Sequence, residues 1–160
     1  MNDKYDREAA RAYALRWAYG RNPRYADFSD MGGDCTNFVS QCLFAGGLSM
    51  NYTPVLGWYY RSLNNRAPAW TGVEYLYQFL TRGNSRPGPG AYVCAPEELM
   101  PGDLAQLSFD GKTFSHSLFV SDVTPSGIFI CTHTYDARQK NLASYTYTDL
   151  RPLHITGGFR

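Results

Sequence analysis

The chain changes its hydrophobic pattern about half-way along, and this change limits the folds open to it more than any other feature. In the first half, apolar residues recur at the three- and four-residue spacing of helices that bury one face. The second half holds short β-prone runs separated by turns. Helices followed by an antiparallel meander predict an α+β fold, with N-terminal helices packed on a small antiparallel sheet or half-barrel. The 160 residues suit one domain that spans positions 1–160.

Three helices are expected in the first half: one from Asp3 to Tyr19, one from Cys35 to Ala45, and one that starts near Thr71. Thr71 and Glu74 stand in capping-box register, which is typical of a helix start. Glycines and prolines predict a loop over residues 83–91. The expected strands are 104–109, 117–123, 127–134, 144–148 and 152–156, and the turn at 124–127 should join the second and third as a hairpin.

The charge balance excludes some partners. The formal net charge of +1 gives no strong field to attract nucleic acid or an acidic membrane surface, so we expect no nucleic-acid partner. No stretch approaches the ~20 apolar residues of a membrane span. The polar N-terminal residues do not resemble a signal peptide. We therefore expect a cytoplasmic protein, or an exported one if this sequence is part of a longer chain.

The four cysteines are spaced too irregularly for a disulfide framework or a structural zinc site, because none forms a CxxC pair. No metal or cofactor is therefore expected. Cys42 lies on the apolar stripe of the second expected helix, where a core position is the natural interpretation.

Cys35 differs from the other cysteines because it begins a helix directly after a Gly32-Gly33-Asp34 turn. A cysteine is a useful nucleophile only as the thiolate, and a helix N-terminus favours that form. Backbone N–H groups at the same end can receive a developing oxyanion. The adjacent Asp34 opposes ionisation of the thiol, so its side chain is expected to turn away, as an N-cap or as a hook for a substrate amine.

A cysteine nucleophile needs a base, and the predicted hairpin places two histidines at one end of the sheet. His116 heads one strand and His133 ends the next. This arrangement favours His116 as the base and His133 as the group that orients its ring. A register slip of one residue would turn His133 to the other face, and Asp136 would then be the orienting group. His154 has no such neighbour and is expected to be structural.

The aromatic residues after the second helix offer a wall for a substrate cleft. Trp58 and Tyr59 could stack on a substrate, and Trp58 could equally fill the core beneath the loop. The candidate substrate-binding residues are therefore Asp34, Trp58 and Tyr59.

Residues 32–41, Gly-Gly-Asp-Cys-Thr-Asn-Phe-Val-Ser-Gln, resemble the nucleophile motif of a bacterial family of amidase domains. That family is allied to the papain-like superfamily, which includes the NlpC-type and CHAP cell-wall hydrolases. The resemblance extends over nearly the whole chain, through Tyr5-Asp6-Arg7, Ala9-Ala10, Tyr13-Ala14, Trp17, Asn22-Pro23, Tyr25, Gly57-Trp58-Tyr59-Tyr60, Trp70-Thr71, Gly102-Asp103-Leu104, His116-Ser117 and His133-Thr134.

The resemblance implies a papain-like, NlpC-like core with Cys35 as nucleophile and His116 as general base. In the wider superfamily the third catalytic position varies, which leaves His133 ahead of Asp136. Peptides derived from peptidoglycan are the implied substrates. No glutamine precedes Cys35 to match the oxyanion residue of papain-type enzymes, so Asn37 or the hydroxyl of Tyr25 would have to assist.

The sequence thus predicts a cysteine amidase or peptidase that works through a thioester and acts on a peptide or cell-wall fragment. Transfer of the acyl group to an amine would use the same thioester. Two other classes stay open. One is a zinc protein using Cys35, His116 and His133, although their spacing matches no common zinc pattern. The other is a non-catalytic module on the same fold, against which the presence of both Cys35 and His116 counts.

Overall fold

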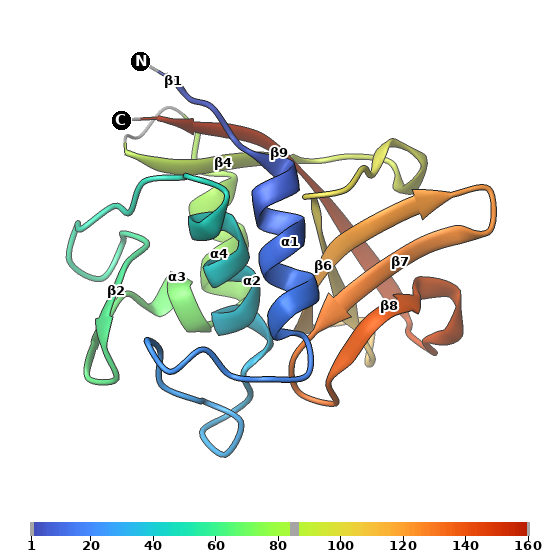
Figure 1. Ribbon diagram of the computed structural model, residues 1–160, viewed down its shortest axis with the longest axis horizontal. Coiled ribbons are helices and arrows are strands. Elements are labelled where there is room, and N and C mark those ends of the chain that lie inside the picture. The colour runs from blue at the N-terminus through green and yellow to red at the C-terminus, as the bar shows by residue number, and fades with distance from the viewer. Residues whose placement is uncertain (1, 84–86, 160) are drawn as a thin grey trace.

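Four helices gather on one side of a large antiparallel sheet in the computed structural model, which describes residues 2–83 and 87–159 (Figure 1). This arrangement confirms the predicted α+β class. The helices are α1 (Arg7–Trp17), α2 (Cys35–Ala45), α3 (Pro68–Thr71) and α4 (Val73–Leu80), with short 3-10 turns η1 (Pro96–Glu98) and η2 (Leu142–Ser144).

The sheet has seven strands in the order β1-β9-β5-β6-β7-β8, with β4 also paired to β9. The long C-terminal strand β9 is therefore paired with β1 from the N-terminus and with β4 and β5 from the middle of the chain. The strands are β1 (Asn2–Asp3), β4 (Gly88–Val93), β5 (Leu104–Ser108), β6 (Phe114–Thr124), β7 (Gly127–Thr132), β8 (Ala137–Asn141) and β9 (Asp149–Phe159). A separate two-stranded ribbon is formed by β2 (Tyr60–Ser62) and β3 (Asn65–Arg66). Thr124 pairs with Gly127, which confirms the predicted hairpin.

The helices begin and end where local chemistry directs. α1 starts at Arg7 because Asp6 is its N-cap and accepts a hydrogen bond from the N–H of Ala9 (3.0 Å). α2 spans the predicted range Cys35–Ala45. The predicted capping box is wrong: Thr71 ends α3, Gly72 is the N-cap of α4, and no side chain caps that helix.

Two predictions in the second half are also wrong. The glycine- and proline-rich stretch predicted as a loop contains β4, which pairs with β9 from Gly88 to Val93. The strand predicted at 144–148 is absent from the described residues there, and β8 lies earlier, at 137–141. In the case of β4 the partner strand comes from a distant part of the chain, so pairing outweighs the local sequence signal.

Each face of the sheet has its own core. The larger core lies between the helices and the sheet and includes Phe38, Trp58, Trp70, Phe119 and Leu153. The smaller core on the opposite face includes Leu99, Leu107, Leu118, Ile130 and Leu142. Neighbouring residues of β6 contribute to opposite cores, as the alternation of side chains along a strand requires.

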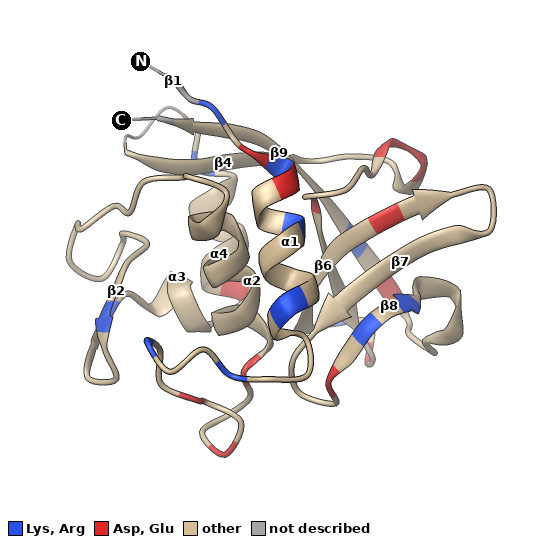
Figure 2. Ribbon diagram, viewed as in Figure 1, with Lys and Arg blue, Asp and Glu red and all other residues tan. Residues whose placement is uncertain are grey.

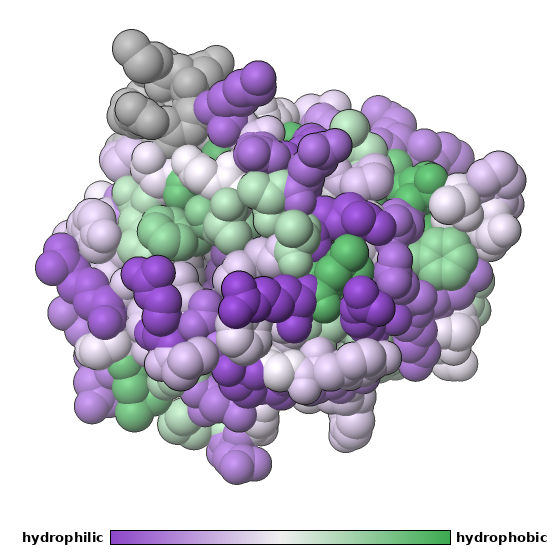
Figure 3. All heavy atoms as spheres, in the orientation of Figure 1, coloured by the Kyte–Doolittle hydropathy of each residue, from purple (hydrophilic) through white to green (hydrophobic). Residues whose placement is uncertain are grey.

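The surface is mixed in charge and hydropathy. Figure 2 shows basic and acidic residues interspersed along the same elements, and Figure 3 shows hydrophilic and hydrophobic residues side by side on the front face. Within the described residues, no helix has the length and apolar character needed to cross a membrane.

Candidate active site

The loop before α2 is shaped by two glycines in the left-handed region, Gly32 (φ 96°) and Gly33 (φ 110°). A Cβ on Gly33 would lie 3.2 Å from Oγ1 of Thr134, in the turn that follows β7. The N–H of Asp34 donates to the same oxygen (2.9 Å). The glycine turn therefore seats the loop against the end of β7 and fixes Cys35, the first residue of α2, against the sheet.

Asp34 is fully buried and joins three parts of the site. Its Oδ1 accepts hydrogen bonds from the N–H of Phe28 (2.8 Å) and from Nδ2 of Asn37 (2.9 Å). Its Oδ2 lies 2.5 Å from Nδ1 of His133. The carboxylate makes no side-chain cap for α2. Asp34 thus occupies the N-cap position of α2, but its carboxylate is a buried structural hub and not the side-chain cap or the exposed substrate hook that the sequence suggested.

His133 has both ring nitrogens occupied inside the protein. Nε2 lies 2.7 Å from the carbonyl oxygen of Trp17, which can only accept, so Nε2 carries a proton. Nδ1 is engaged by Asp34, and the ring packs against Phe38 with centroids 4.1 Å apart. The structure therefore joins His133 to the helix side of the sheet, and neither nitrogen is left to orient His116.

Asp136, the alternative orienting group, is also engaged elsewhere. Its two carboxylate oxygens accept hydrogen bonds from Nη1 and Nη2 of Arg21 (2.9 and 3.0 Å). The same guanidinium lies 3.5 Å from Oδ2 of Asp34. Asp136 thus belongs to an ion-pair cluster behind the nucleophile loop.

His116 lies near the start of β6, paired with Leu107 and 8% exposed. Its Nε2 is 3.4 Å from Oγ1 of Thr132, whose single proton is directed to the carbonyl oxygens of Ser117 (2.9 Å) and His133 (3.0 Å). The hydroxyl therefore accepts from an Nε2–H, which leaves Nδ1 as the basic nitrogen. Burial lowers the pKa of His116 to about 4, so the ring is neutral at pH 7.

The thiol of Cys35 lies beside β6, next to Ser117, the residue that follows His116. Its Sγ accepts a hydrogen bond from the N–H of Ser117 (3.5 Å) and lies 3.8 Å from Oγ1 of Thr36. Burial raises the pKa of Cys35, the two hydrogen-bonding groups lower it in part, and the Asp34 carboxylate raises it again. Among the described residues, the thiol and the imidazole are linked through Ser117 and make no direct hydrogen bond.

The sequence matches a known family over most of its length. Residues 4–156 match the family described as "Putative amidase domain". The chain belongs to this family. The protein described as "Uncharacterized protein YhbB" from Bacillus subtilis (strain 168) is 37% identical over 142 residues, which cover 86% of this chain and 44% of that protein. The chain thus spans less than half the length of that relative. No solved structure matches the chain significantly.

The name of the family indicates hydrolysis of an amide bond.

Trp58, a candidate substrate-binding residue, is fully buried. Its ring centroid lies 4.7 Å from that of Trp70, and its Nε1 donates to Oγ of Ser40 (3.1 Å). Tyr59 is partly exposed and packs on Tyr52. Of the two alternatives for Trp58, the core position is the one the structure shows.

The two oxyanion candidates suggested for the amidase family motif are used in packing. Nδ2 of Asn37 donates to the carbonyl of Ala26 and to Asp34, and its Oδ1 accepts from Nε1 of Trp70 (3.0 Å). Tyr25 stacks on Trp70 with ring centroids 6.0 Å apart. Asn37 is therefore not available to an oxyanion, which leaves the first-turn backbone N–H groups of α2 as candidate donors beside the thiol.

Thr132 is the residue that sequence reasoning missed. It stands between Cys131 and His133, and its own side chain faces His116. The alternation of β7 holds the signal: Thr132 and His133 must point to opposite faces, so only one of them can share a face with His116.

The zinc alternative gains no support from the geometry. Within residues 2–83 and 87–159, no three His, Cys, Asp or Glu side chains form a group that could hold a metal ion. All four cysteines are free thiols.

An apolar hollow of about 350 Å³ lies away from Cys35 and His116. It is lined by Asn51, Thr53, Val55, Leu56, Ala69, Tyr75, Gln78, Phe79 and Arg82.

Proposed function

We propose that this protein is a cysteine amidase of the papain-like type, in which Cys35 attacks an amide carbonyl and forms a thioester. The observation that carries the proposal is the 3.5 Å hydrogen bond from the N–H of Ser117 to Sγ of Cys35. It sets the thiol at the N-terminus of a helix, beside the residue that follows His116. A nucleophile and a neutral base from neighbouring elements are what acyl transfer needs. Under this proposal residues 1–160 form one catalytic domain.

The reaction begins with transfer of the thiol proton to Nδ1 of His116. Sγ then bonds to the amide carbon while the π electrons of the carbonyl move to its oxygen, which the first-turn N–H groups of α2 receive. The C–N bond breaks as Nδ1 returns the proton to the leaving amine. A water molecule, deprotonated by the same nitrogen, attacks the thioester, releases the carboxylate and restores the thiol. Thr132 holds Nε2–H throughout and so keeps Nδ1 as the active nitrogen.

We propose peptide amides in cell-wall fragments as the substrate class. The support is the likeness of residues 32–41 to the nucleophile motif of an amidase family that is allied to cell-wall hydrolases, together with the amidase name of the matched family. In a transferase, an acceptor amine would take the place of water in the last step and receive the acyl group, and the earlier steps would be unchanged.

The proposal is tested by incubating the protein with solubilised peptidoglycan fragments and a panel of peptide amides, followed by mass spectrometry of products and of the intact protein. We expect the wild type to release an amine and to carry a transient acyl group on Cys35. Cys35→Ser should abolish turnover. Cys94→Ala, on another cysteine outside the site, should not change it. Turnover by Cys35→Ala at the wild-type rate would refute the cysteine mechanism.

A further inference from the structure

Three directly opposed residues form a row across the sheet beneath the thiol. In the strand register, Gln106 on β5 faces Ser117 on β6 and Arg151 on β9. Opposed residues in antiparallel strands share one face, so all three side chains project toward the helices. Gln106 and Ser117 are fully buried. The row therefore links Ser117, beside Cys35, to β9, which lies two strands from β6 in the sheet.

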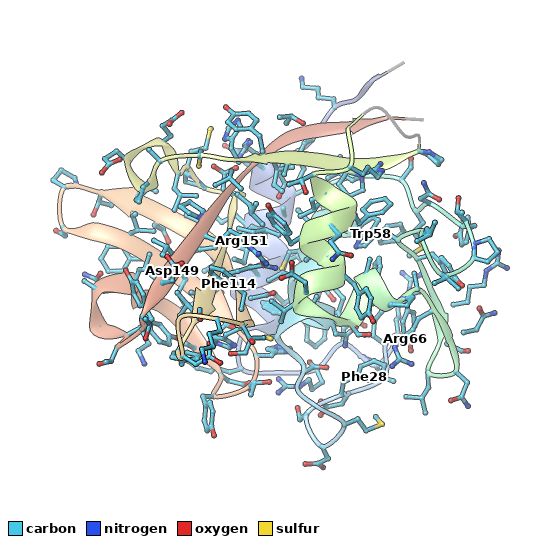
Figure 4. All side chains as sticks on the ribbon, turned by 180° about the vertical axis from the view of Figure 1, so that it is seen from behind. Phe28, Trp58, Arg66, Phe114, Asp149 and Arg151 are labelled. Carbon is cyan, nitrogen blue, oxygen red and sulfur yellow. The ribbon has the colours of Figure 1, made fainter. Side chains whose placement is uncertain are left out.

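Arg151 anchors the far end of this row (Figure 4). Its guanidinium carbon lies 3.6 Å from the Tyr77 ring centroid and 4.1 Å from that of Phe114, between α4 and the start of β6. Nη2 donates to Oε2 of Glu74 (2.9 Å), so the charge is paired. Two rings and an ion pair fix the plane of the guanidinium and leave it little rotational freedom.

The fixed guanidinium determines how the next amide is oriented. Nε and Nη2 of Arg151 both donate to Oε1 of Gln106 (3.0 and 2.6 Å). Arginine has no acceptor, so the amide must turn its oxygen toward Arg151 and its nitrogen away. Nε2 of Gln106 then donates to the carbonyl of Val73 (3.0 Å) and to Oγ of Ser117 (3.3 Å).

The direction of donation continues through two hydroxyls to the sulfur. Because Oγ of Ser117 accepts from Gln106, its own proton is available for Oγ1 of Thr36, 3.0 Å away. Thr36 then has its proton available for Sγ of Cys35 at 3.8 Å. Each hydroxyl that accepts from the preceding group keeps its single proton for the next contact, so the series has one consistent direction toward the sulfur.

We propose that Arg151 is a positioning residue for the nucleophile: through Gln106 it turns the hydroxyl protons of Ser117 and Thr36 toward Sγ of Cys35. This inference rests on the proposed function for the role of Cys35. The chain of donors lies in a nearly dry environment, where prearranged hydrogen bonds to a developing anion are most effective. It stabilises the thiolate as it forms, against the adjacent carboxylate of Asp34.

The charged and titratable groups around the thiol are few, which makes the effect measurable. Asp34 precedes Cys35 in the chain and is bonded to His133, with Arg21 beyond it. His116 is neutral at pH 7. A change made at Thr36 leaves all of these charges in place, so the Thr36 variants report on the hydroxyl alone.

The experiment measures the pH dependence of iodoacetamide alkylation at Cys35, read from the Cys35 peptide by mass spectrometry. Thr36→Val removes the last hydroxyl at constant shape, and it should slow alkylation at pH 8 by about tenfold and move the profile to higher pH. Thr36→Ser, which restores the hydroxyl, should recover the rate. Gln106→Glu and Arg151→Met should act in the same direction as Thr36→Val. Arg61→Met, which removes an exposed arginine that stacks on Tyr52 outside the row, serves as the control for loss of a positive charge, with an unchanged profile.

A wild-type profile in Thr36→Val would overturn the proposal. A shifted profile in Thr36→Val combined with a wild-type profile in both Gln106→Glu and folded Arg151→Met would overturn the part played by Arg151. Melting temperatures identify any variant that fails to fold, and the Thr36 pair remains decisive in that case. Labelling of Cys35 does not depend on turnover, so a failure of the amidase proposal is seen separately, as absence of product from the wild type.

Discussion

Nδ1 of His133 lies 2.5 Å from Oδ2 of Asp34, and this contact makes the second histidine of the hairpin a support for the nucleophile loop. The other oxygen of the carboxylate holds the N–H of Phe28 and the amide of Asn37. One buried carboxylate thus joins the loop, the first turn of α2 and the end of β7. The position of Cys35, which follows Asp34, depends on all three.

Replacing His133 should therefore affect stability more directly than chemistry. His133→Ala leaves the carboxylate of Asp34 buried without its ring partner, so we expect a loss of about 3 kcal/mol in the free energy of unfolding. Urea denaturation at pH 7 measures it. Asp34→Asn combined with His133→Ala should recover part of the loss, because the buried carboxylate that has lost its ring partner is then absent. His133→Ala with wild-type stability would show that the contact contributes nothing.

His116 should make the fold sensitive to acid. The folded protein keeps this ring neutral down to a pKa of about 4, whereas the unfolded chain takes up the proton near 6.5. The unfolded state binds more protons between these values, so stability is full above pH 6.5 and falls as the pH is lowered toward 4. The total contribution is about 3 kcal/mol.

The measurement compares wild type and His116→Gln by urea denaturation at pH 7.5, 5.5 and 4.5. Other groups titrate equally in both proteins, so the difference between the two curves isolates His116. We expect the free energy of unfolding of the wild type to exceed that of His116→Gln by less and less as the pH falls from 7.5 to 4.5. Parallel curves would mean that the ring is accessible to protons in the folded state.

Thr132 should matter for rate. Thr132→Val keeps the shape but removes the acceptor for Nε2–H of His116, so the ring can reorient and the other tautomer becomes available. We expect kcat to fall by about tenfold to a hundredfold, with a smaller change in KM. Thr113→Val, in the exposed turn before β6, is the matched control. Equal kinetics for Thr132→Val and wild type would leave His116 without an orienting group.

The elements with strong local signals could be predicted from sequence. The helix Cys35–Ala45 and the hairpin at Thr124 and Gly127 follow from apolar spacing and turn residues, and both were placed correctly. The strand Gly88–Val93 could not be, because its glycines and proline favour a loop until β9 supplies a partner from 60 residues further along the chain.

The site shows the same division between local and long-range information. Cys35 at a helix start and His116 at a strand start are properties of short segments. The partners of His133 are not, since Trp17 and Asp34 reach it from parts of the chain that the hairpin pattern does not contain. A register shift between Val120 and Asp122 adds to the difficulty, because one extra residue changes which side chains share a face.

The resting thiol and imidazole should both be neutral, and this leads to a last prediction. Burial lowers the pKa of His116 to about 4 and raises that of Cys35 above its ordinary value. No pH exists at which the free protein would hold a large population of thiolate–imidazolium pairs. The rate of Cys35 alkylation by iodoacetamide should therefore rise by about tenfold per pH unit from pH 6 to pH 9, as it does for an unassisted thiol.

The rate constants are best compared with those of N-acetylcysteine under the same conditions, with Cys35→Ala used to subtract labelling of the other cysteines. A plateau between pH 5 and pH 7 would mean that an ion pair is already formed before any substrate arrives. If the rise is continuous, proton transfer to His116 belongs to the reaction with substrate, whose carbonyl supplies the acceptor that the thiolate lacks in the resting site. A solvent deuterium isotope effect on acylation should then be present, because transfer of the thiol proton to His116 takes place during acylation.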